Sequence, residues 1–140
     1  MTYRVALACL LAFATISQPA IAEETKKRKA TFFMKHSYSA AYTVQRASVQ
    51  VSCFPEKLQR ILAHIASETG HRPMVTSGHR PRSGRSQHSR CFAADIRVPG
   101  VSERRIVAAA KRAPGIGGVG RYCNGIVHVD IGPRRNWVYC

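Results

Sequence analysis

The stretch at residues 86–95 reads Ser-Gln-His-Ser-Arg-Cys-Phe-Ala-Ala-Asp. It places one imidazole, that of His88, seven positions before one carboxylate, that of Asp95. The even-numbered residues from 92 to 98 are apolar and would share one face of a β-strand, whereas Asp95 would point to the other face. An unpaired carboxylate in such an apolar setting is costly to bury, so a compensating group is expected.

A second run of the same type, Ile-Val-His-Val-Asp at residues 126–130, supplies another imidazole and another carboxylate. Asp95 and Asp130 are the only two aspartates in the chain. If the two strands are neighbours, these groups converge on one point. A divalent metal ion held by His88, Asp95 and His128 would compensate the charge, because three protein ligands plus a water form the usual catalytic zinc arrangement. The alternative is a structural network of hydrogen-bonded polar groups.

The patterns around these two runs predict an α+β fold. The clearest helix covers residues 55–69, where apolar side chains follow the i, i+3, i+4, i+7 spacing and Gly70 ends the pattern. A second helix is expected between Ser102 as N-cap and Pro114, and the glycine-rich segment 115–120 is interpreted as a loop. Strands are expected at residues 42–52, 74–77, 92–98, 125–131 and 137–140. This order predicts a mostly antiparallel sheet with helices packed on one face.

The N-terminus has the features of a secretory signal peptide. Residues 1–22 contain a positive charge, an apolar segment and an Ala-x-Ala cleavage site that ends at Ala22. Cleavage there leaves 118 residues (140 minus 22), enough for one domain. Residues 23–40 carry a run of charge and are interpreted as a flexible basic arm, and residues 41–140 as the domain itself. A periplasmic or secreted location is therefore predicted.

The cysteine count fits an exported protein. Four cysteines remain after the expected cleavage, at positions 53, 91, 123 and 140. An even number of cysteines in a small secreted domain predicts two disulfides, and four cysteines allow three pairings. A cysteine-rich zinc site is the alternative, but no two of these cysteines have the C-x-x-C spacing typical of such sites.

The chain is strongly basic, with a formal net charge of +15. Such a charge attracts polyanions of any kind, so loose contact with anionic wall polymers or a membrane surface is expected. Charge alone predicts no specific binding of nucleic acid. The glycine-rich segment lacks the lysine of a phosphate-binding loop, which argues against nucleotide binding. A monomer is expected.

The motifs carry a resemblance to a known family. The pattern Ser86-x-His88-x4-Ala93-x-Asp95 is similar to the Ser-x-His-x-x-Gly-x-Ala-x-Asp signature of the zinc D-Ala-D-Ala peptidase superfamily, which includes the hedgehog domain. Residues 77–80 resemble the upstream Ser-Gly-Tyr-Arg element of that superfamily. Residues 117–122 and 127–137 are similar to its YcbK-type bacterial subgroup, so the resemblance spans about half of the chain.

This resemblance implies a hedgehog or D-Ala-D-Ala peptidase-like fold with a zinc ion held by His88, Asp95 and His128. It implies that Arg80 contacts the substrate or the polarised carbonyl and that Ser86 supports the metal loop. The implied activity is hydrolysis of peptidoglycan stem peptides by a metal-activated water, as a D-Ala-D-Ala carboxypeptidase or a murein endopeptidase. The alternative is a non-catalytic, metal-containing module of the same fold that binds the cell wall or polyanions.

Three positions depart from the family pattern. His79 stands in place of a tyrosine, Cys91 in place of a glycine and Cys123 in place of a proline. The two substituted cysteines suggest that they arose as a pair.

The general base is a further departure. Many relatives carry an acidic residue or a histidine shortly before the last zinc histidine, and residues 121–125 contain neither. Asp130 is the nearest carboxylate that the sequence order favours for the role of taking a proton from water. The alternative is that Asp130 orients His128 or pairs with an arginine.

Overall fold

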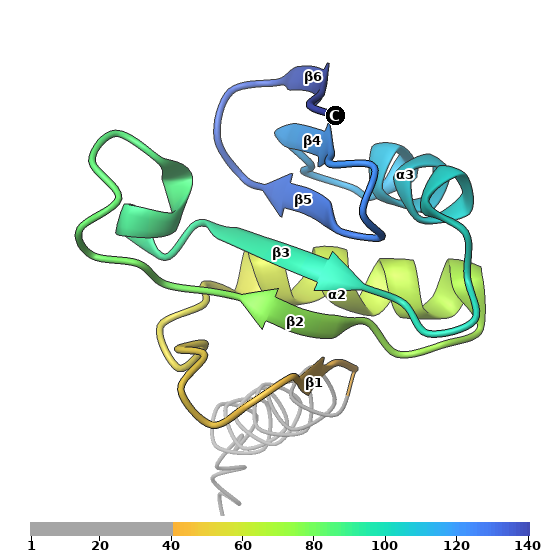
Figure 1. The fold of residues 1–140 in the computed structure, drawn as a ribbon, viewed down its shortest axis with the longest axis horizontal. Helices are drawn as coiled ribbons and strands as arrows, with labels where there is room; N and C mark the ends of the chain where they lie inside the picture. The colour runs from red at the N-terminus through yellow and green to blue at the C-terminus, as the bar shows by residue number, and fades with distance from the viewer. Residues whose placement is uncertain (1–40) are drawn as a thin grey trace, which may run out of the picture.

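The computed structural model describes residues 41–140, which form one sheet with two α-helices behind it (Figure 1). The expected signal peptide at 1–22, its cleavage site and the basic arm at 23–40 lie outside these residues. No helix in the described part of the chain is long and apolar enough to cross a membrane.

The elements follow one another in a mixed α and β order. They are β1 (Thr43–Val44), α2 (Glu56–Thr69), β2 (Met74–Ser77), the 3-10 helix η1 (Gln87–Arg90), β3 (Ala93–Arg97), α3 (Glu103–Arg112), β4 (Gly118–Arg121), β5 (Val127–Asp130) and β6 (Arg135–Val138). The sheet order is β1-β2-β3-β5-β4-β6. The four inner strands are antiparallel neighbours, whereas the edge strands β1 and β6 run parallel to β2 and β4. The α+β prediction is confirmed, and the sheet is mixed because of its two edges.

Helix α2 forms where the apolar spacing predicts it. Its apolar stripe is fully buried and consists of Leu58, Ile61, Leu62 and Ile65. Gly70 adopts the left-handed conformation (φ 75°) and donates its N–H to the carbonyl of Ala66, which ends the helix. Helix α3 also follows its predicted N-cap, Ser102, although the side chain of this serine makes no capping hydrogen bond.

The glycine-rich segment is a correction to the sequence-based prediction, because part of it is strand β4 rather than loop. Strand β4 pairs with β5 on one side and β6 on the other. Its glycines leave space that neighbouring side chains fill: a Cβ at Gly118 would collide with the carboxylate of Asp130, and one at Gly120 with the ring of Trp137. The edge strands also differ from the predicted strands at 42–52 and 137–140. Strand β1 is only two residues long, and β6 begins before residue 137.

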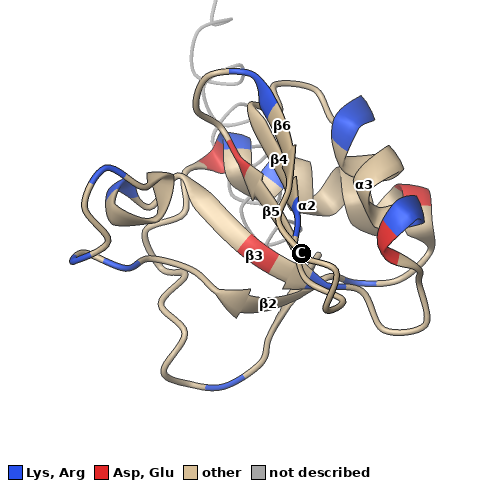
Figure 2. Ribbon diagram, turned by 45° about the horizontal axis from the view of Figure 1, so that its top comes forward, with Lys and Arg blue, Asp and Glu red and all other residues tan. Residues whose placement is uncertain are grey.

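The core lies between the helices and one face of the sheet. The sheet contributes Val75, Ala94, Ile96, Val119, Val127 and Val129 to it. Because side chains alternate along a strand, Asp95, His128 and Asp130 occupy the opposite face. Figure 2 shows the single acidic position of β3, which is Asp95, and the basic residues on loops and helix ends.

Two disulfides join the four described cysteines, Cys53 to Cys91 and Cys123 to Cys140. Two disulfides were predicted with their pairing left open, and Cys91 and Cys123, which were suggested to have arisen as a pair, are each bonded to another cysteine. These two cysteines are the only described residues other than glycine with positive φ, at 62° and 56°. A side chain is disfavoured in this conformation, so each disulfide holds a backbone turn that glycine would adopt more readily.

Removing the Cys53–Cys91 disulfide should lower the free energy of unfolding by about 2–5 kcal/mol, because the bridge restricts the unfolded chain. The test is denaturant unfolding of the doubly substituted Cys53→Ser, Cys91→Ser protein beside the unsubstituted protein. Thiol titration of the denatured, unreduced protein lacking residues 1–22 should find no free thiol. Four free thiols would show that the bridges do not form.

Candidate functional site

A row of paired residues crosses the sheet on the face turned away from the helices. Asp95 on β3 lies opposite Ser77 on β2 and His128 on β5. On the other side of His128 the row continues through Gly120 on β4 to Trp137 on β6. Because paired residues of neighbouring strands point to the same face, this register brings the polar side chains of β3 and β5 together.

Three atoms suited to metal coordination meet on this row. The Nδ1 atom of His128 lies 2.9 Å from Oδ1 of Asp95. The Nε2 atom of His88 lies 3.2 Å from Nδ1 of His128 and 3.3 Å from Oδ1 of Asp95. All three residues are buried, and together they form a group that could hold a metal ion. The structure therefore brings together His88, Asp95 and His128, which the sequence singled out.

Each imidazole is oriented by an acceptor on its other nitrogen. The Nδ1–H of His88 donates to the carbonyl of Gly78 at 2.6 Å, because a carbonyl can only accept. The Nε2–H of His128 donates to Oδ2 of Asp130 at 2.9 Å. These contacts leave the lone pairs of His88 Nε2 and His128 Nδ1 directed at one another and at Asp95. Three lone pairs facing one point repel each other unless a cation or proton lies between them.

The size of this triangle fits a tetrahedral metal ion. Zinc bound at about 2.0–2.1 Å by tetrahedral ligands holds the ligand atoms about 3.3–3.4 Å apart. The three distances here run from 2.9 to 3.3 Å, so small shifts would suffice. The alternative of a cysteine-rich site is excluded for the described cysteines, because all four are in disulfides.

The charges of the group follow from its contacts. Burial raises the pKa of the Asp95 carboxyl, but when the facing imidazole nitrogens carry protons rather than lone pairs, hydrogen bonds from His128 and His88 outweigh burial and hold this pKa well below its ordinary value. Burial lowers the pKa of His128, whereas its contacts with Asp130 and Asp95 raise the pKa, and the net shift is upward. The site is therefore strongly cation-attracting, with Asp95 ionised at neutral pH.

Asp130 is fully buried behind His128. Its Oδ1 atom accepts the backbone N–H groups of Gly118 at 2.9 Å and Gly132 at 2.8 Å. Its Oδ2 atom accepts from His128 and, at 2.8 Å, from the guanidinium of Arg135. A carboxylate has about four lone-pair sites, and here all four are used. This geometry matches the second role considered for Asp130, that of orienting His128 and pairing with an arginine.

The loop that carries His88 is a short 3-10 helix, which sequence patterns did not predict. Ser86 caps it, because its hydroxyl accepts the backbone N–H of His88 at 3.3 Å. At the other end, the backbone N–H of Cys91 donates to the carbonyl of His88. Arg80 flanks the loop from outside: its side chain is half exposed, and its Nη2 atom lies 3.8 Å from Oδ2 of Asp95.

Comparison with known families places this geometry in context. The model of the family described as "Peptidoglycan L,D-endopeptidase MepK" matches residues 56–137, which is more than half of the chain. The chain belongs to this family. No curated protein and no solved structure matches it significantly. The MepK family lies within the zinc D-Ala-D-Ala peptidase-like superfamily, so the resemblance is confirmed and the chain is a metallopeptidase.

The MepK-family match ends at Trp137, one of two aromatic residues at the site to which the sequence assigned no role. The Trp137 ring centroid lies 5.1 Å from that of His128, and the guanidinium of Arg135 lies 5.1 Å from the Trp137 ring. The second is Tyr122, the residue that directly follows β4. Burial and the charge of Asp95 raise the pKa of its phenol, although Arg80 acts in the opposite direction. Both residues lie in the sequence runs that resemble the family, and this resemblance was the one signal that could have pointed to them.

Proposed function

We propose that this protein is a zinc-dependent endopeptidase that cleaves peptidoglycan stem peptides. The observation that carries the proposal is the buried meeting point of His88, Asp95 and His128, with both imidazoles held so that their lone pairs converge. When bound there, zinc makes water a nucleophile near neutral pH and polarises the scissile carbonyl. The family description names an L,D-endopeptidase of peptidoglycan, which favours endopeptidase over carboxypeptidase action.

In this proposal Asp130 supports His128 rather than taking a proton. The three described glutamates are paired with Arg60, Arg112 and Arg121, so none of them supplies a free side-chain carboxylate to the site. Tyr122 is protonated at neutral pH like any ordinary tyrosine, and the raised pKa of its phenol is consistent with a position near Asp95, so its hydroxyl can donate a hydrogen bond to the substrate. Arg80 supplies a permanent positive charge on the exposed side, suited to a developing oxyanion or a substrate carboxylate.

Replacing Arg80 by alanine should lower kcat/KM by about 10²–10³-fold with little change in zinc content, because a charge-stabilising donor is lost while the ligands stay. Arg82→Ala is the matched control, since Arg82 lies in the same exposed loop without a contact to Asp95. Steady-state hydrolysis and metal analysis of both variants are the measurements. If kcat/KM falls equally in the two variants, Arg80 has no specific role in the reaction.

The function is tested by incubating the zinc-loaded protein with purified peptidoglycan and identifying the products by mass spectrometry. An endopeptidase opens cross-links between peptides, whereas a carboxypeptidase releases single terminal residues. Retention of the protein on peptidoglycan without any product would favour the non-catalytic binding module instead.

The proposed substrate and the two disulfides both fit a location outside the cytoplasm. We further propose that export removes residues 1–22. N-terminal sequencing of the exported protein should then begin at Glu23.

A further inference from the structure

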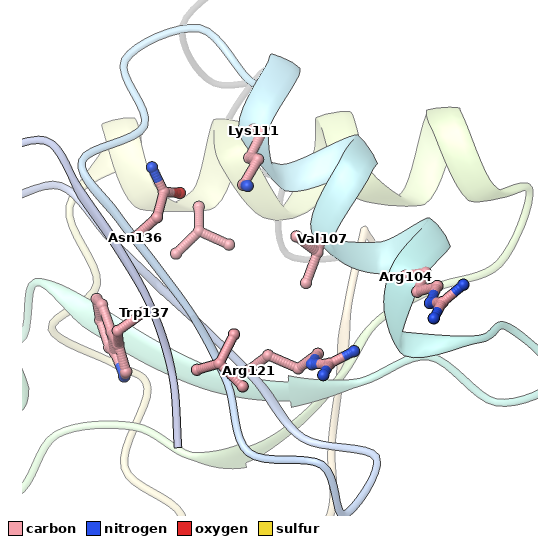
Figure 3. A pocket seen from close by; sticks show the side chains of 8 residues that line it. Arg104, Val107, Lys111, Arg121, Asn136 and Trp137 are labelled. Atoms are coloured by element: carbon pink, nitrogen blue, oxygen red, sulfur yellow. The ribbon is translucent and has the colours of Figure 1, made fainter. Parts of the chain in front are cut away.

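A hollow lies between α3 and the edge strand β6, as Figure 3 shows. Its volume of about 580 Å³ is within the range of ligand sites, roughly 300–1,000 Å³. Val107, Val119 and Val138 provide its apolar surface. Arg104, Lys111 and Arg121 line it together with the amide of Asn136, so the hollow combines apolar contacts with three cations.

This hollow is separate from the metal-ligand group, because it lies on the other face of the sheet. On β4, Val119 and Arg121 alternate with Gly120, and it is Gly120 that pairs with His128. Trp137 is among the residues that line the hollow, but in Figure 3 its ring lies across the strands from Val107. A ligand in the hollow would therefore leave the face that carries the metal-ligand group open.

The positive charge of the hollow is poorly compensated. Arg104 and Lys111 make no ion pair within residues 41–140. Arg121 has only Glu103, at 4.0 Å, and its Nε–H is buried without a hydrogen-bond acceptor. Buried donors are normally hydrogen-bonded, so the Arg121 guanidinium favours an anionic acceptor as its partner. Among residues 41–140, none of those that line the hollow is acidic.

The neighbouring strand favours a peptide as the occupant. In the described sheet β6 is an edge strand, paired only with β4. An extended peptide can add to such an edge through main-chain hydrogen bonds and place alternate side chains beside it. Val138 offers apolar contact for small side chains at this edge, while the cations suit carboxylates.

We propose that the groove between α3 and β6 binds an acidic peptide strand with small apolar side chains. If the proposed function holds, an uncleaved stem peptide of peptidoglycan is the source of that strand. The protein then holds the wall on one face of its sheet while the other face acts on a second peptide.

The test is binding of the probe peptide acetyl-Ala-Glu-Ala-Glu-Ala to the protein with a metal chelator present, so that no cleavage occurs. The double variant Arg104→Glu, Lys111→Glu should bind the probe peptide at least about tenfold more weakly, because negative charges then face a negative peptide. Arg46→Glu is the control: Arg46 is exposed and outside the groove. Its binding should stay within about twofold, and the glutamine analogue of the probe should bind weakly to every form.

Three results would overturn the inference. Equal weakening by Arg46→Glu would mean general attraction to a basic protein, and equal binding of the glutamine probe would mean no carboxylate recognition. If anionic vesicles or polyphosphate bind to the groove and the probe peptide does not displace them, the groove has a different occupant. Hydrolysis is measured separately with zinc: a protein that cleaves nothing but shows the predicted binding pattern defeats the proposed function and leaves the groove assignment standing.

Discussion

Replacing His88 by alanine should reduce bound zinc from one ion per chain to none and abolish peptidoglycan cleavage. Two protein ligands would remain, fewer than the three that catalytic zinc sites use. The substitution also frees the carbonyl of Gly78, which accepts from His88. Metal analysis after dialysis, together with product analysis, measures both effects.

The matched control is His71→Ala, an exposed histidine outside the site, which should keep its zinc. The decisive contrast is the triple alanine variant of His88, Asp95 and His128. If this variant still carries one zinc ion per chain, the ion lies elsewhere and the assignment fails.

Replacing Asp130 by asparagine should weaken zinc binding about 10–100-fold, because the acceptor that orients His128 is altered. It should also destabilise the fold by about 1–3 kcal/mol or more, since an amide NH2 would face buried donors. Depending on its orientation, the NH2 group would face either the N–H groups of Gly118 and Gly132 or the N–H of His128 beside the half-exposed guanidinium of Arg135. Zinc titration and denaturant unfolding measure the two effects.

A different outcome for Asp130→Asn would identify Asp130 as the general base. If Asp130→Asn keeps normal zinc affinity and stability but loses hydrolysis by about 10²–10⁴-fold, Asp130 is the general base. Arg135→Lys is the comparison variant, because it leaves the Asp130 carboxylate unchanged. It keeps a positive charge beside Asp130 while removing the planar guanidinium.

Local patterns in the sequence were sufficient for helix α2 and for the strands that carry the site. The apolar stripe from Leu58 to Ile65 has helical spacing, and alternation on β5 places His128 and Asp130 on one face. The meeting of His88, Asp95 and His128 required one further assumption, that β3 and β5 are neighbours, which their pairing bears out.

The errors concern features set by neighbours in space. Strand β4 contains glycines because Asp130 and Trp137 occupy the space that side chains would take, and no local pattern shows this. The disulfide pairs depend on which turns lie side by side, so the positions of Cys91 and Cys123 alone could not give them. The role of Asp130 stays a prediction, because its contacts with the backbone N–H groups of Gly118 and Gly132 do not follow from the alternation of residues along β5.

Zinc-edge X-ray absorption of the zinc-loaded protein tests the central claim most directly, because it identifies the atoms bound to the metal. Coordination by His88, Asp95 and His128 predicts only nitrogen and oxygen neighbours at about 2.0–2.2 Å, with the multiple-scattering signature of two imidazoles. Sulfur neighbours at about 2.3 Å, or a shell without imidazole, would contradict it.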